Sequence, residues 1–169
     1  GGVGKTTIAR IIYESVSHLF EGYYFLDNVK EALKYEGLAS LQEKLLSGAL
    51  MKRNIEIPDG DGATLIKRRI SNLKALIILD DVNHLSQLQK LAGGYDWFGP
   101  GSRVIVTTRD EHLLISHGIE RRYNVEGLNI DEALQLFSQK AFREDRPKEG
   151  YFDLCSQVVD YCGGLPFAL

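Results

Sequence analysis

The stretch GGVGKTT, residues 1–7, decides the fold, because it stands directly before an amphipathic helical pattern and matches the end of the P-loop sequence G-x-x-x-x-G-K-[ST]. Glycine lets backbone N–H groups approach phosphate oxygens without a Cβ in the way. The first turn of the following helix presents unpaired N–H groups to negative charge. A glycine-rich turn before an ordinary helix is the alternative. The residues expected to bind a polyphosphate are Gly2, Val3, Gly4, Lys5, Thr6 and Thr7, with Lys5 at the β- and γ-phosphates.

Ligands for a metal ion come from two separate stretches. The P-loop pattern assigns the hydroxyl of Thr6 to Mg²⁺. The second stretch, LIILDD at residues 76–81, is an apolar run that ends in two acids, and ligands of open α/β sheets sit beyond the carboxyl ends of the strands. We expect Asp80 to hold Mg²⁺, directly or through water, and Asp81 to orient or deprotonate a water near the γ-phosphate. The alternative is an acidic helix cap after a strand.

A third signal is Arg109, which directly follows the β-branched stretch RVIVTT. If that stretch forms a strand beside the one that ends in the acidic pair, the guanidinium lies on the same rim and can read a terminal phosphate. Thr107 and Thr108 are placed to position it. The alternative is a surface ion pair with Asp110 or Glu111.

The composition excludes several classes of partner. The chain has 169 residues, 44% of them hydrophobic, and its 20 Lys and Arg against 23 Asp and Glu give a net charge of −3. Nucleic acids and anionic membranes both require a basic surface. The longest aliphatic run, at 75–79, is far shorter than the roughly 20 residues that span a bilayer. We therefore expect no nucleic-acid partner and no membrane span.

The two cysteines, Cys155 and Cys162, indicate a reducing compartment. Within one helix they would lie about 10 Å apart, and a disulfide needs Cα atoms within about 7 Å. We expect both thiols to be buried as apolar groups. The four histidines show no zinc-site spacing with these cysteines, so no structural metal is expected. The expected location is cytoplasmic or nucleocytoplasmic.

Helical and strand patterns alternate over most of the chain and predict an α/β fold, a parallel sheet flanked by helices. The runs at 75–79 and 103–108 fit strands buried on both faces of such a sheet. Only helical patterns follow residue 127, starting with a capping box at Asn129 and Glu132. We expect a nucleotide-binding subdomain at 1–127 and the start of a helical subdomain at 128–169. The expected elements are helices at 6–19, 38–50, 63–73, 84–92, 110–116, 129–142 and 152–162, strands at 23–26, 75–79, 103–108 and 121–125, and a loop at 51–62.

Six motifs in order resemble the NB-ARC domain of plant disease-resistance proteins, and the resemblance covers essentially the whole chain. Within that family, the second motif is similar to the Toll/interleukin-receptor (TIR) class of nucleotide-binding leucine-rich-repeat proteins. The motifs are GGVGKTT (1–7), FLDNVKE (25–31), LIILDDVN (76–83), GSRVIVTTRD (101–110), YNVEGLNIDEALQLFSQKAF (123–142) and CGGLPFAL (162–169).

The resemblance implies ADP or ATP with Mg²⁺ as ligands, the acidic pair as the Walker B residues and Arg109 as a phosphate sensor. It also implies that Pro166, in a motif similar to GLPL, packs near the adenine and ribose; an ordinary proline in the first turn of a helix is the alternative. Implied partners are TIR and leucine-rich-repeat domains and further copies of the protein. Both ends fall within family motifs, so the chain resembles a fragment without its central P-loop strand, and we expect it to be insoluble or to bind nucleotide poorly by itself.

The expected function is a nucleotide-controlled immune switch with, at most, slow ATP hydrolysis. A turnover ATPase or kinase on the same scaffold is one alternative, but no second arginine is placed as a finger within the chain. A degenerate scaffold without nucleotide is another, and the intact GKTT and DD sequences argue against it. Guanine specificity is not expected, because the chain has no N-K-x-D motif.

Overall fold

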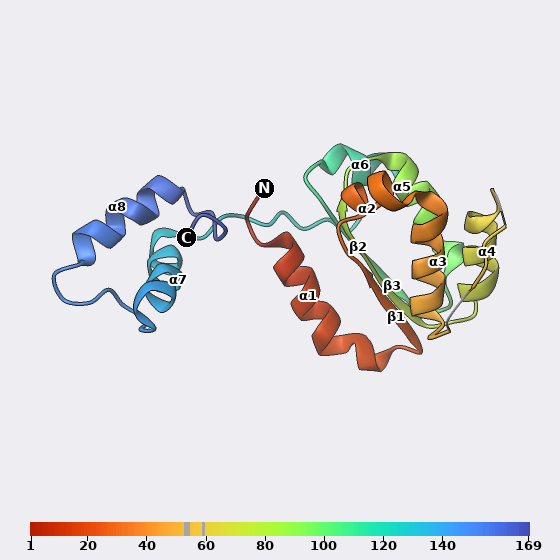
Figure 1. Ribbon diagram of the computed structural model, residues 1–169, viewed down its shortest axis with the longest axis horizontal. Coiled ribbons are helices and arrows are strands. Elements are labelled where there is room, and N and C mark those ends of the chain that lie inside the picture. The colour runs from red at the N-terminus through yellow and green to blue at the C-terminus, as the bar shows by residue number, and fades with distance from the viewer. Residues whose placement is uncertain (53–54, 59) are drawn as a thin grey trace. The chain divides into compact units, whose positions relative to one another are not determined.

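The computed structural model describes residues 1–52, 55–58 and 60–169, which divide into two compact units (Figure 1). One unit, residues 6–122, contains the sheet, and the other comprises residues 1–5 and 123–169. The loop expected at 51–62 falls in part on residues 53, 54 and 59, which lie outside the described residues. The subdomain boundary expected at residue 127 stays a prediction.

Among the described residues, the sheet consists of three parallel strands in the order β1-β2-β3. They are β1 (Gly22–Leu26), β2 (Ala75–Val82) and β3 (Arg103–Thr108). Strand β2 lies in the middle and is buried along almost its whole length, as its apolar run predicted. A parallel sheet with crossover helices confirms the predicted α/β class.

One face of the sheet packs against several helices, which form a layer in Figure 1. These helices are α2 (Val29–Glu36), α3 (Leu38–Ala49), α4 (Gly62–Ile70) and α5 (Leu85–Leu91). Their aliphatic side chains, among them Leu45 and Ile66, bury Ile77 and Leu79 of β2 in one cluster, which we call the large cluster. Successive residues of a strand point to opposite faces, so Ile77 and Leu79, two positions apart, face the same helices.

The opposite face of the sheet packs against α1 (Lys5–Val16), which continues into a 3₁₀ turn at Ser17–Leu19. Ala9 of this helix is buried against Leu76 and Ile78 of β2, in a group that we call the small cluster. The Tyr13 ring completes it by meeting the Phe25 ring edge-on, with centroids 5.6 Å apart. The burial of apolar surface on this face is therefore less extensive than on the other.

The amino end of the sheet is closed by tight backbone contacts. A Cβ at Gly22 would overlap the carbonyl oxygen of Ala49, so the glycine lets α3 approach the start of β1. The Ser102 hydroxyl accepts the N–H of Ala75 at 2.8 Å and donates to the carbonyl of Leu73 at 3.0 Å. These contacts hold the starts of β1 and β2, and the residue before β3, in fixed positions.

Two strand predictions need correction. The predicted strand at 103–108 has the expected bounds, but it is not buried on both faces: Arg103 and Val104 are exposed because β3 lies at the edge of the described sheet. The strand expected at 121–125 was wrong, since no strand is formed there in the described structure and Tyr123 is 85% exposed. The chain passes from one compact unit to the other between Arg122 and Tyr123, and this segment pairs with none of the described strands.

The second unit contains a pair of helices, α7 (Ile130–Phe142) and α8 (Phe152–Cys162). The predicted capping box is confirmed: Asn129 accepts the N–H of Glu132 at 2.9 Å, and the Glu132 carboxylate accepts the N–H of Asn129 at 3.0 Å. Both cysteines of α8 are buried free thiols, as predicted, and the Cys162 thiol donates to the carbonyl of Ala168. Among the described residues, no helix combines the length and the apolarity needed to cross a membrane.

Candidate functional site

The acidic pair lies at a β-bulge where β2 ends. Leu79 pairs with Val106 and Val82 pairs with Thr108, so two residues of β2 stand opposite a single residue of β3. The second of the two, Asp81, has a φ of 50°, in the left-handed region that few residues other than glycine adopt. A bulge re-aims side chains. Regular alternation would place Ile78 and Val82 on one face, but Ile78 packs in the small cluster and Val82 in the large cluster. The expected strand ended at residue 79, so the sequence did not predict this bulge.

Asp80 is the polar centre of the site. Its side chain is only 2% exposed, and a buried carboxylate must be hydrogen-bonded to avoid a large desolvation penalty. The Thr6 hydroxyl donates to its two oxygens at 3.0 and 3.1 Å, and the Thr107 hydroxyl donates to Oδ1 at 2.6 Å. Thr6 and Asp80, both expected at a metal ion, therefore meet although 74 residues separate them in the sequence.

Thr107 connects the two acids. Its Oγ1 accepts the backbone N–H of Asp81 at 2.9 Å while its proton goes to Asp80. The sequence suggested that this threonine positions Arg109, and it did not predict a link to the acidic pair. The only sequence signal for that link is a threonine at the end of a β-branched strand.

Arg109 lies on the same rim as the acidic pair, as expected for parallel neighbours. Its Nε is 3.5 Å from Oδ1 of Asp81, in an ion pair whose arginine side chain is 67% exposed. An exposed pair of this kind contributes about 1 kcal/mol or less, so the guanidinium can change partner at little cost. The alternative of an ion pair with Asp110 or Glu111 was wrong, because Asp110 caps α6 (Glu111–Ser116) and Glu111 pairs with Arg122.

The glycine turn belongs to the second unit. Gly2 and Gly4 have φ values of 86° and 96°, which explains why glycine occupies both positions. The N–H of Phe167 donates to the carbonyl of Gly2 at 3.2 Å, so the segment that contains Pro166 lies beside the turn. Pro166 is in a turn after α8 has ended, rather than in the first turn of a helix.

Lys5 opens α1, and Thr6 and Thr7 follow in its first turn. The N–H groups of a first turn have no partner within the helix and carry its positive dipole end. Of these three residues, Thr6 forms a hydrogen bond with Asp80. The roles expected of Val3, Lys5 and Thr7 stay predictions.

Residues 1–147 match the NB-ARC domain family. The chain belongs to the NB-ARC family. This match confirms the predicted family, and it agrees with the parallel sheet and flanking helices, because NB-ARC is a nucleotide-binding domain with the fold of P-loop NTPases.

Plant disease resistance proteins resemble the NB-ARC chain over its full length. It is 44% identical over 172 residues to disease resistance protein RUN1 of Vitis rotundifolia and 43% identical over 176 residues to TMV resistance protein N of Nicotiana glutinosa. It is 39% identical over 173 residues to disease resistance protein RML1B of Arabidopsis thaliana. The alignments cover 100%, 100% and 99% of this chain but only 13%, 15% and 17% of the three relatives.

The donor set of the NB-ARC site suits Mg²⁺. Hard cations prefer oxygen ligands, and Mg²⁺ is commonly held by one or two carboxylates together with substrate phosphates and water. Thr6 and Asp80 supply a hydroxyl and a carboxylate within 3.1 Å of each other, next to the start of a helix. No group of three or more His, Cys, Asp and Glu side chains suited to a metal is found among the described residues.

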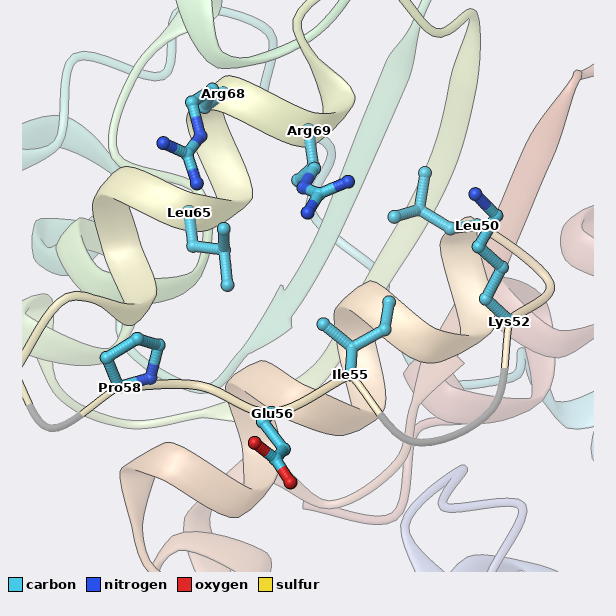
Figure 2. A pocket seen from close by; sticks show the side chains of 8 residues that line it. All are labelled: Leu50, Lys52, Ile55, Glu56, Pro58, Leu65, Arg68 and Arg69. Carbon is cyan, nitrogen blue, oxygen red and sulfur yellow. The ribbon is translucent and has the colours of Figure 1, made fainter.

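A cavity of about 420 Å³ lies elsewhere in the sheet unit of the NB-ARC chain. Figure 2 shows Arg68 and Arg69 reaching it from α4, across from Ile55 on the preceding loop. Helix α4 leads into the amino end of β2, whereas Asp80 lies towards the carboxyl end of that strand. The cavity is therefore separate from the acidic rim.

Proposed function

We propose that this NB-ARC chain is the ADP- and ATP-binding switch of an intracellular plant immune receptor of the TIR class. The observation that carries the proposal is the meeting of Thr6, Asp80 and Thr107 at the carboxyl end of the sheet. In the sequence, Thr6 follows the glycine-rich stretch 1–4. The likeness to plant disease resistance proteins supports the immune role. ADP would hold the resting state, and exchange for ATP would favour opening and self-assembly.

Each residue of the proposed site has one task. Backbone N–H groups of the glycine turn and the Lys5 ammonium group bind phosphate oxygens. Thr6 and Asp80 hold Mg²⁺, which when bound neutralises part of the phosphate charge. Asp81 orients or deprotonates a water for, at most, slow hydrolysis, and Arg109 leaves its ion pair with Asp81 to contact a γ-phosphate.

The energetics of such a switch are reasonable. Inverting a 1:99 population to 99:1 takes about 5.5 kcal/mol of differential binding. Hydrogen bonds to charged groups contribute about 1.5–3 kcal/mol each, so two to four contacts unique to the γ-phosphate suffice. Arg109 can supply one of them because its pairing with Asp81 is exposed and weak. Fast hydrolysis is not required.

The partners proposed for the whole protein are TIR and leucine-rich-repeat domains and further copies of the same protein, in the cytoplasm or in both cytoplasm and nucleus. The chain spans less than a fifth of the length of the relatives described above, so most of each relative lies outside the matched region. Nucleic acid is not among the proposed partners, because the net charge is −3.

The deciding experiment identifies the nucleotide that co-purifies with the longest form of the protein carrying residues 1–169. The protein is denatured and the released base is analysed; an adenine nucleotide is expected. Absence of any nucleotide, together with no binding of added ADP, would refute the proposal. Sustained multiple turnover of ATP would favour a turnover ATPase instead.

Two variants test the assigned residues. Lys5→Ala is expected to weaken nucleotide binding at least tenfold, and Asp80→Ala to reduce the gain in affinity that Mg²⁺ gives. Matched controls are Lys30→Ala and Asp96→Ala, which remove exposed charges from surface ion pairs and should leave binding unchanged. Unchanged binding in both site variants would disprove the phosphate site.

A further inference from the structure

The bulge at the end of β2 leaves a gap in the ladder that a side chain fills. Asp80 and Asp81 together face Thr107, so the strand backbones cannot pair there in the regular way. The Asp81 N–H donates instead to the Thr107 hydroxyl at 2.9 Å. A backbone donor that would be left without a ladder partner is thus satisfied by a side chain of the neighbouring strand.

A hydroxyl group can donate one hydrogen bond, and the Thr107 hydroxyl donates it to Asp80. Because the Thr107 oxygen accepts from Asp81, its own proton is free to donate to Asp80 Oδ1, at 2.6 Å. That distance is typical of a strong hydrogen bond from a hydroxyl to a carboxylate. Thr107 is 8% exposed and Asp80 is 2% exposed, so the bond forms out of bulk solvent, where it is stronger.

We propose that Thr107 is a positioning residue, which fixes the orientation of the Asp80 carboxylate for Mg²⁺ and ties that orientation to the backbone of Asp81. The inference rests on the proposed function, because it concerns how the same site takes its metal. Thr6 approaches Asp80 from α1 and is itself a proposed metal ligand, whereas Thr107 approaches from β3 and its hydroxyl bonds to both acids of the pair. Loss of its hydroxyl should therefore weaken the response to Mg²⁺ and leave phosphate binding without metal unchanged.

The test uses Thr107→Val, which keeps the shape of the side chain and removes the hydroxyl, and Thr107→Ser, which keeps the hydroxyl. The affinity of a fluorescent ADP analogue is measured with excess EDTA and with saturating Mg²⁺, on the longest form of the protein that carries residues 1–169. In Thr107→Val, the gain in affinity due to Mg²⁺ is expected to fall about tenfold, or about 1.4 kcal/mol. Thr107→Ser should stay within about threefold of the wild type in both conditions.

Two further variants keep the test decisive. Thr107→Ala cannot overpack the site and should show the same tenfold loss, so the question stays answerable if Thr107→Val does not fold. Thr64→Val makes the same substitution at an exposed position of α4 and should change nothing.

The inference is overturned if Thr107→Val and Thr107→Ala keep the full response to Mg²⁺, if they weaken binding equally with and without Mg²⁺, or if Thr107→Ser behaves like them. Its failure differs from failure of the proposed function. If only the inference about Thr107 fails, Lys5→Ala and Asp80→Ala still impair binding. If the proposed function fails, the wild type binds no nucleotide at all.

Discussion

The two faces of the sheet differ in how they are held. Successive residues of β2 enter different clusters: Ile77 joins the large cluster under α2–α5, and Ile78 joins the small cluster under α1. The helix that carries Thr6 is thus attached through the smaller amount of buried apolar surface. Elements with few buried apolar contacts open most easily, so the face under α1, which carries the proposed nucleotide site, is the side whose stability a ligand can change most.

The largest expected effect compares neighbouring core residues. Ile77→Ala should destabilise the fold by about 4 kcal/mol, because the large cluster cannot collapse into the cavity. Ile78→Ala should cost about 2 kcal/mol, since the partly buried rings of Tyr13 and Phe25 can shift to fill the space. Hydrogen exchange of the β2 amides measures both losses. Equal losses of stability in the two variants would show that the two faces are packed equally well.

Bound nucleotide should protect the two faces unequally. At 100 times its Kd, ADP adds about 2.7 kcal/mol of stability, or about a 100-fold slowing of exchange, to any opening that destroys the site. We expect that slowing in the amides of α1 and less than about threefold in those of α3, whose openings leave the site intact. Hydrogen exchange with and without ADP and Mg²⁺ gives the comparison. Slowing of both helices to the same degree would mean that they open together.

The same overpacking substitution can be placed on either face. Ala9 on α1 and Ala49 on α3 are 2% and 1% exposed, and replacement of either by Leu should cost about 1–3 kcal/mol. Only Ala9→Leu should also weaken nucleotide binding, by about threefold to tenfold, because it displaces the helix that carries Thr6. Thermal unfolding and ADP titration of both variants test this. A loss of affinity in Ala49→Leu alone would reverse the assignment.

The smallest expected effect appears at alkaline pH. Burial raises the pKa of Tyr13, and nearby Tyr23 and Tyr24 add to the rise; burial also raises the pKa of Tyr24 on the opposite face. The folded pKa exceeds the unfolded value of about 10, so the folded chain binds more protons above that pH and loses stability as the pH rises further.

Urea unfolding at about pH 8 and about pH 11 should show this loss, and ultraviolet titration should show late tyrosinate formation. Tyr13→Phe and Tyr24→Phe should each remove part of the loss without changing stability near neutral pH. A loss that persists in full in both variants would mean that other groups cause it.

Features set by neighbouring residues were predictable from the sequence. The β-branched stretch RVIVTT gave strand β3 with its observed bounds, and the Asn129 and Glu132 pair gave the start of α7, because each pattern acts over a few residues. The glycine turn and the start of α1 also followed from a local pattern. The approach of Arg109 to the acidic pair followed from topology, since parallel strands place their carboxyl ends on one rim.

Other features set by distant residues were not predictable. The bulge at Asp81 is held by Thr107, 26 residues further along the chain, and two adjacent acids carry no local sign of a left-handed backbone. The segment at 121–125 has the apolar alternation of a strand, but pairing needs a neighbour that the pattern does not contain. For the same reason, the sequence could not show that β3 lies at an edge.

Gly22 has no side chain, and this lets the start of β1 lie directly against the end of α3. A single methyl group at this position would overlap the backbone of Ala49 at the end of α3 and push the strand and the helix apart. Since β1 is paired to β2 residue for residue, from Gly22 opposite Ala75 to Leu26 opposite Leu79, the strand could yield only by sliding or tilting as a whole. A change at one end of the sheet would then be transmitted to the opposite rim, and a seemingly harmless alanine there could misalign chemistry that it never touches.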